Sequence, residues 1–108
     1  MSGEEVVTEL SSKDFDEFTK KGLVFVDFFA DWCMPCVMMT PVIEELAEEF
    51  SGKIKFGKLN VNDNELVAKK FNVNSIPNFV LLKDGKIADQ FVGATDAEEI
   101  ETRLGKFL

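Results

Sequence analysis

The chain has 108 residues, of which 20 are acidic and 12 are basic, so its formal net charge at pH 7 is −8. We expect one domain over residues 1–108, and a hydrophobic fraction of 45% is enough for a packed core, which excludes general disorder. The acidic balance argues against a protein that binds nucleic acid through its phosphates, and no apolar run approaches the roughly 18 residues of a membrane-spanning helix.

The chain opens with a strand pattern followed by a short helix pattern. Residues 6–10 fit a short first strand. Residues 11–14 look like a helix start, with hydroxyls to cap it and an acid in the first turn, and Gly22 offers a stop. The dense apolar run at residues 23–30 is typical of a buried parallel strand, because both faces of such a strand are covered.

A longer helix is predicted after Cys36, with Gly52 at its end. Its apolar residues follow the i, i+3, i+4, i+7 spacing of an amphipathic helix: Ile43, Leu46, Ala47 and Phe50. Pro41 has no N–H to donate to the preceding turn, so we expect a kink there. Residues 54–61 then alternate as a strand does.

The second half of the chain contains a helix pattern and then a hairpin pattern. Asp63 can cap a short helix that runs through Phe71. Two apolar runs follow, at residues 79–82 and 87–92. They flank the turn sequence KDGK at residues 83–86, which is a strong hairpin signal.

A last helix is predicted to be capped by Thr95, with Glu98 three residues further on. Four apolar residues line one face of this helix: Ala97, Ile100, Leu104 and Leu108. Helices that alternate with strands and are followed by a hairpin indicate an α/β fold. We therefore expect a mixed central sheet covered by helices on both faces.

Cys33 and Cys36 are the only cysteines, and histidine is absent. Without histidine there are no Ser/His or Cys/His nucleophile pairs, and two thiols do not complete a tetrahedral zinc site, so no metal centre is expected in one chain. Two cysteines three residues apart in a helical turn face the same side, at a separation that a disulfide can span. Cys33 falls at the predicted helix start, where free N–H groups and the helix dipole favour a thiolate. Pro35 fits the first turn, where its missing N–H is not needed.

A structural role for this pair is the first alternative. A ring closed over so few residues removes little entropy from the unfolded chain, about 2 kcal/mol, so the bond would be a poor staple. Catalytic redox use is therefore the favoured interpretation. A metal or cluster shared by two chains is the remaining alternative, and an absorption spectrum would reveal it.

Around this pair the sequence resembles the thioredoxin family. The matching residues occur in the family's order along nearly the whole chain: residues 26–36 (VDFFADWCMPC), Pro41, Lys58, Ile76, Pro77, Gly85 and Gly93. The resemblance implies the thioredoxin fold and a protein-disulfide reductase that works by dithiol–disulfide exchange without a cofactor. It also implies that Cys33 attacks the substrate disulfide and that Cys36 resolves the mixed disulfide. The implied partners are disulfide-containing proteins and a flavin- or ferredoxin-linked thioredoxin reductase.

The resemblance further implies a docking surface around the dithiol, formed by six residues: Trp32, Met34, Pro35, Ile76, Pro77 and Gly93. In the family the peptide bond before the matching proline is cis, and its loop pairs with an extended substrate segment. Met34 departs from the glycine that is commonest in the family and adds flexible apolar surface. A buried core tryptophan and a trans proline are the structural alternatives. Other departures are Phe29, Asn62 and Asn78.

Asp27 interrupts the apolar strand that precedes the dithiol. A carboxylate there loses hydration, so we expect its pKa to rise and the protein to be destabilised above the pKa of the unfolded chain. The resemblance supplies a role, as the base that takes the Cys36 proton through a water. Lys58 occupies the family position near Asp27 and would moderate its pKa, or would be an ordinary exposed strand lysine. The alternative for Asp27 is that it points at solvent or pairs with Lys58.

Two further function classes stay open. One is a glutaredoxin-like or isomerase-like oxidoreductase, which glutathione-dependent activity would reveal. The other is a redox-independent binding module, whose binding would survive loss of both cysteines. The acidic chain start (MSGEEVVTEL) lacks the positive charge of a secretory signal, so we expect a cytoplasmic protein, and a monomer. A phosphate loop at residues 52–58, a calcium loop at residues 60–71 and functional acidic helix faces are all disfavoured.

Overall fold

The computed structural model describes residues 6–108, so the first five residues of the acidic chain start lie outside the described residues. In chain order the elements are β1 (Val7–Leu10), α1 (Phe15–Thr19), β2 (Leu23–Phe29), α2 (Met34–Glu49), β3 (Lys55–Asn60), α3 (Glu65–Lys70), β4 (Asn78–Lys83), β5 (Lys86–Val92) and α4 (Ala97–Gly105). The strands form one sheet in the order β1-β3-β2-β4-β5. β1, β2 and β3 are parallel, whereas β4 is antiparallel to both β2 and β5. The expected mixed sheet is confirmed.

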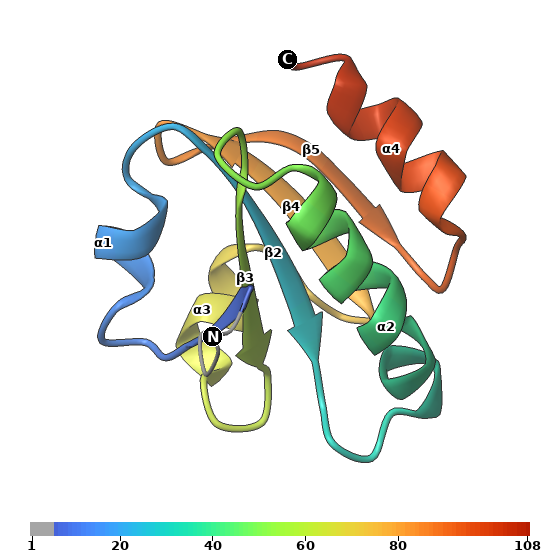
Figure 1. Ribbon diagram of the computed structural model, residues 1–108. Coiled ribbons are helices and arrows are strands. Elements are labelled where there is room, and N and C mark those ends of the chain that lie inside the picture. The colour runs from blue at the N-terminus through green and yellow to red at the C-terminus, as the bar shows by residue number, and fades with distance from the viewer. Residues whose placement is uncertain (1–5) are drawn as a thin grey trace.

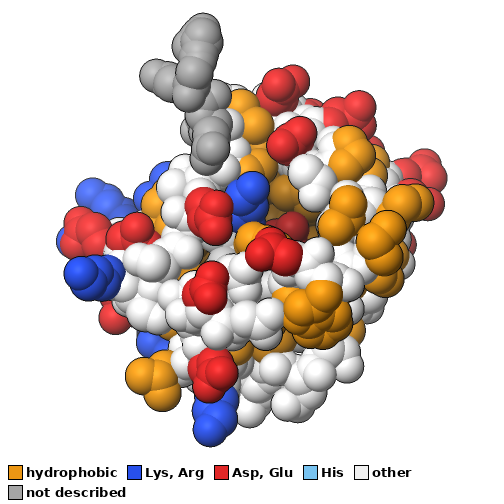
Figure 2. Space-filling model, turned by 90° about the horizontal axis from the view of Figure 1, so that it is seen from below, with side chains coloured by type: hydrophobic (Ala, Val, Ile, Leu, Met, Phe, Trp, Pro, Cys, Tyr) orange, Lys and Arg blue, Asp and Glu red, His pale blue; other side chains and the backbone are white. Residues whose placement is uncertain are grey.

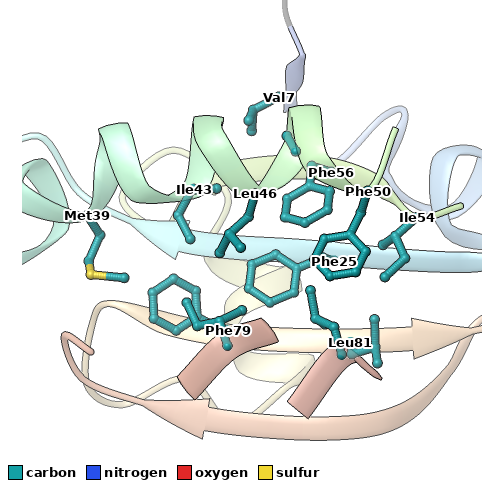
Figure 3. Packing of buried hydrophobic residues seen from close by; sticks show 13 residues of the cluster. Val7, Phe25, Met39, Ile43, Leu46, Phe50, Ile54, Phe56, Phe79 and Leu81 are labelled. Atoms are coloured by element: carbon teal, nitrogen blue, oxygen red, sulfur yellow. The ribbon is translucent and has the colours of Figure 1, made fainter. Parts of the chain in front are cut away.

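Helices cover both faces of this sheet (Figure 1). α2 and α4 pack on one face, over a core that contains Phe25 of β2 and Phe79 of β4 (Figure 3). α1 and α3 pack on the other face, over Val24 and Val26. Because side chains alternate along a strand, the odd-numbered residues of β2 face α2, and Asp27 belongs to that set.

The predicted buried face of α2 is confirmed, since all four of its expected core residues are buried: Ile43, Leu46, Ala47 and Phe50. Pro41 lies inside the helix, as expected. The predicted hairpin is also confirmed. Asp84 and Gly85 both have positive φ, 52° and 85°, which suits a tight two-residue turn between β4 and β5.

Three predicted helix starts were wrong in detail. α1 is preceded by Asp14, whose carboxylate accepts a hydrogen bond from Ser11 N at 2.7 Å and does not cap the helix. α3 begins after Asn64 rather than at Asp63, and the Asn64 amide oxygen accepts from Ser12 N at 2.9 Å. α4 is capped by Asp96, which accepts from Glu99 N at 2.9 Å, so the cap lies one residue after the predicted one.

The predicted helix ends also differ from the structure. α1 ends at Thr19, three residues before the expected stop. α4 ends at Gly105, so Leu108 falls beyond it and is exposed rather than part of the apolar face. Ile100 and Leu104, which lie within the helix, are buried as predicted.

The topology brings three segments together at one end of the sheet. β2 leads at this end into the Cys33–Cys36 segment. Asn78, the first residue of β4, pairs with Phe28 near the end of β2 and with Val92 at the end of β5. The residues that precede β4 and follow β5 therefore lie beside the dithiol. Within residues 6–108, no helix has the length and apolar character required to cross a membrane.

Candidate active site

Cys33 and Cys36 form a disulfide at the start of α2, with their Cα atoms 5.3 Å apart. Cys33 is the N-cap of the helix, and its Sγ accepts a hydrogen bond from Cys36 N at 3.2 Å. Pro35 lies in the first turn, where helix geometry leaves N–H groups free. A helix of 16 residues thus directs an amide and the positive end of its dipole at the Cys33 sulfur. This arrangement favours negative charge on that sulfur in the reduced protein.

Behind the disulfide lies a cavity of about 170 Å³ between β2, β3 and α2. Of the two cysteines, only Cys36 lines it, together with Asp27, Thr40 and Lys58. A polar cavity of this size has room for bound water. The two cysteines therefore have different surroundings, because Cys33 meets the helix amide and Cys36 faces a carboxylate across the cavity.

Asp27 is buried, with 6% of its surface exposed, and its Oδ1 has no hydrogen-bond partner among the described residues. Burial raises the pKa of the Asp27 carboxyl from its ordinary value of 3.8 to about 7, and the Lys58 charge opposes this rise. The expected rise in pKa is confirmed, and the interpretation of Asp27 as a solvent-facing residue is wrong. The pKa of Asp27 rises because desolvation by the surrounding core outweighs the attraction of one lysine.

Lys58 pairs in register with Asp27 across β2 and β3, so the two side chains lie on the same sheet face. Its ammonium forms no ion pair with Asp27 within residues 6–108 and lies 5.9 Å from the centre of the Phe29 ring. Lys58 is half-buried and lines the cavity. The alternative of an ordinary exposed strand lysine is therefore wrong.

The other expected site residues lie at the same end of the sheet as the disulfide. Trp32 and Met34 are 69% and 65% exposed, so the interpretation of Trp32 as a buried core residue is wrong. Ile76 packs against the buried cluster that contains both cysteines, and the bond between Ile76 and Pro77 is cis. Figure 2 views the end of the molecule where α2 begins, and hydrophobic side chains gather on it beside acidic ones.

Gly93 is held beside Pro77, because Gly93 N donates a hydrogen bond to the Pro77 carbonyl at 2.8 Å. Its φ of 101° is a conformation that favours glycine. A Cβ at this position would meet nothing within 4 Å, so the space beside Gly93 is open to a partner.

Two cavity residues were missed by the sequence interpretation. Thr40 and Val37 both line the cavity, and Thr40 donates a hydrogen bond to the Cys36 carbonyl at 3.5 Å. The signal for Thr40 was present, because residues four apart share a helix face and Thr40 follows Cys36 by four. Among residues 6–108, no group of three or more His, Cys, Asp or Glu side chains is placed to hold a metal ion.

Comparison with known proteins decides the family. The family model described as Thioredoxin matches residues 6–106. The chain belongs to the thioredoxin family. It is similar to thioredoxin of Chlamydia pneumoniae, with 43% identity over 101 residues that cover 94% of this chain and 98% of that protein. It is also similar to thioredoxins of Staphylococcus haemolyticus and Staphylococcus aureus, with 41% and 40% identity over 102 residues that cover 94% of this chain and 98% of each relative.

Membership of the thioredoxin family gives the disulfide its function. A family match over nearly the whole chain coincides with a cysteine pair at the start of a helix. The protein is a thiol–disulfide oxidoreductase of the thioredoxin type, and its fold is the thioredoxin fold. Its redox centre is the cysteine pair itself.

Proposed function

We propose that this chain, acting as one domain over residues 1–108, reduces protein disulfides with Cys33 as nucleophile, Cys36 as resolving thiol and Asp27 as base. One observation carries the assignment of roles. Cys36 and Asp27 line the same cavity, whereas the Cys33 sulfur accepts a hydrogen bond from the Cys36 amide at the start of α2.

In the first step the Cys33 thiolate attacks one sulfur of the substrate disulfide. A bond forms between the Cys33 Sγ and that sulfur, the substrate disulfide breaks, and the other substrate sulfur leaves as a thiolate. The amide of Cys36 supports the thiolate before attack, because it already donates to the Cys33 Sγ at 3.2 Å.

In the second step Asp27 accepts the proton of the Cys36 thiol through water in the cavity. The Cys36 thiolate then attacks the Cys33 Sγ, the Cys33–Cys36 disulfide forms, and the second substrate sulfur leaves as a thiolate. Two electrons have then passed from the dithiol to the substrate. A pKa of about 7 suits Asp27 for this role, since a general base works best when its pKa lies near the operating pH.

The substrate docks on the surface formed by Trp32, Met34, Pro35, Ile76, Pro77 and Gly93. Two observations support this placement. Ile76 packs against the cysteine cluster, and the open space beside Gly93 admits the backbone of an extended segment. Trp32 and Met34 contribute apolar surface that is exposed to solvent when no substrate is bound.

We also propose the electron donor, the location and the oligomeric state of the protein. A flavin- or ferredoxin-linked thioredoxin reductase returns electrons to the dithiol, and the protein acts as a cytoplasmic monomer that binds neither nucleic acid nor membranes. A charge of −8 supports the absence of phosphate-driven binding.

The equilibrium potential of the dithiol tests the direction of electron flow. In glutathione buffers, we expect the Cys33–Cys36 couple to be more negative than about −220 mV, so that it reduces the disulfides of cytosolic proteins. The fraction of reduced protein can be measured by acid quenching and mass spectrometry of alkylated thiols. A potential well above the cytosolic glutathione value would instead indicate an oxidant or isomerase.

A further inference from the structure

One side chain ties together both ends of the loop that carries Pro77. Residues 72–77 form this loop, between the C-cap of α3, Phe71, and the first residue of β4, Asn78. Gln90 of β5 donates from its Nε2 to the Phe71 carbonyl at 3.0 Å and to the Asn78 Oδ1 at 3.1 Å. A glutamine amide has two N–H donors, so both are used in this clamp.

The strand register explains why Gln90 reaches both groups. Val92 pairs with Asn78 and Gln90 pairs with Val80, so Asn78 and Gln90 are diagonal neighbours on one sheet face. That face is the one covered by α3, whose last carbonyls have no partner within the helix. Asn78 is only 2% exposed, so its polar atoms depend on protein partners.

The loop held by Gln90 touches the redox site at two points. Ile76 packs against the cluster of Ala30, Cys33 and Cys36, and the Pro77 carbonyl accepts from Gly93 N. We infer that Gln90 is a positioning residue, which holds the loop of residues 72–77 against the dithiol and so sets how fast Cys33 reacts with a disulfide in a protein chain. The inference rests on the docking role proposed above for this loop.

A protein substrate and a small disulfide must then respond differently to loss of the clamp. A protein segment has to lie along the loop while its sulfur meets Cys33, whereas a small disulfide needs only Cys33. Gln90→Met nearly preserves the length of the side chain and removes both donors. We expect this variant to lower the second-order rate constant for reaction with insulin about five- to tenfold. The rate constant for reaction with 5,5′-dithiobis(2-nitrobenzoate), a small disulfide, should change by less than about twofold.

Both rate constants can be followed by stopped flow with the fully reduced protein, using the fluorescence of Trp32, the only tryptophan in the chain. Amide hydrogen exchange reports on the clamp separately. Because the Gly93 amide is bonded to the Pro77 carbonyl, its exchange should accelerate by about tenfold in the Gln90→Met variant. Unchanged exchange at Gly93 would show that Gln90 does not hold the loop, and would overturn the inference.

Arg103→Met is the matched control. Arg103 pairs with Asp89, the neighbour of Gln90 on β5, at 3.0 Å, but on the sheet face covered by α4. This variant should lower the denaturant midpoint and leave both rate constants and the Gly93 exchange unchanged. If Gln90→Met behaves like Arg103→Met, Gln90 has only a structural role and the inference is wrong. It is also wrong if Gln90→Met slows both substrates equally, because Gln90 then acts on the dithiol and not on docking.

Ile76→Ala separates this inference from the proposed docking site. If Ile76→Ala slows the reaction with insulin and Gln90→Met does not, the docking site stands and the role of Gln90 is refuted. If neither variant slows that reaction, the docking role of the loop fails, and the inference fails with it.

Discussion

Replacing Cys33 with serine is expected to abolish the reduction of insulin disulfides, with a loss of more than about 1000-fold in rate. Serine preserves the shape of the site but supplies no thiolate, and Cys36 lines the cavity beside Asp27, whereas the helix amide donates to the Cys33 sulfur. The measurement is the release of insulin thiols in a single turnover with fully reduced protein. Substantial activity in Cys33→Ser would contradict the nucleophile assignment.

Cys36→Ser is the matched control, because it keeps the nucleophile and removes the resolving thiol. We expect this variant to form a mixed disulfide with insulin that persists and is seen by mass spectrometry without reductant. Cys33→Ser should form none. The opposite pattern, with the adduct on Cys36, would reverse the two roles.

Replacing Asp27 with alanine is expected to stabilise the oxidised protein at pH 8 by up to about 4 kcal/mol, because each unit of pKa shift corresponds to about 1.36 kcal/mol. Below pH 3.8 the carboxyl is protonated in both the folded and the unfolded chain, so its burial carries no charge penalty there. Between pH 3.8 and about 7 the unfolded chain releases the proton while the folded protein retains it, so stability falls as pH rises. Above about pH 7 the destabilisation is complete.

Urea unfolding of both oxidised proteins at pH 3.5 and pH 8 measures this effect. The stability gained in Asp27→Ala should be large at pH 8 and nearly absent at pH 3.5, and Asp27→Asn provides a control of unchanged size. Both variants should also slow the decay of the mixed disulfide with substrate. The burial account is refuted if Asp27→Ala is less stable than the wild-type protein at pH 8, or if the difference does not depend on pH.

Much of the fold was predictable from local pattern. The apolar spacing of α2 reflects burial against the sheet, and the dense apolar run of β2 reflects burial between helices on both faces; both predictions were confirmed. Helix starts were less predictable, because several neighbouring polar residues can each serve as a cap. Asn64 occupies the position before α3, but its side chain does not cap the helix and instead accepts a hydrogen bond from Ser12, a contact between residues 52 apart in sequence.

The redox site was predictable where its chemistry lies in one stretch of sequence. Cys33, Cys36 and Asp27 fall within ten residues, and a carboxylate inside an apolar strand is visible without a structure. The Gln90 clamp was not predictable in this way. It joins β5 to the end of α3 and the start of β4, and only the register of the sheet reveals that these groups meet.

The central claim is that the start of α2 makes Cys33 a reactive thiolate, and the pH dependence of alkylation tests it most directly. The rate of iodoacetamide labelling at Cys33 should be followed in the reduced protein from pH 5 to pH 10, with the urea-unfolded protein as reference. We predict that the folded protein reaches half of its maximal rate at least one pH unit below an ordinary thiol, which titrates near about 8.5. A Cys33 that reacts no faster at neutral pH than in the unfolded chain would contradict the account.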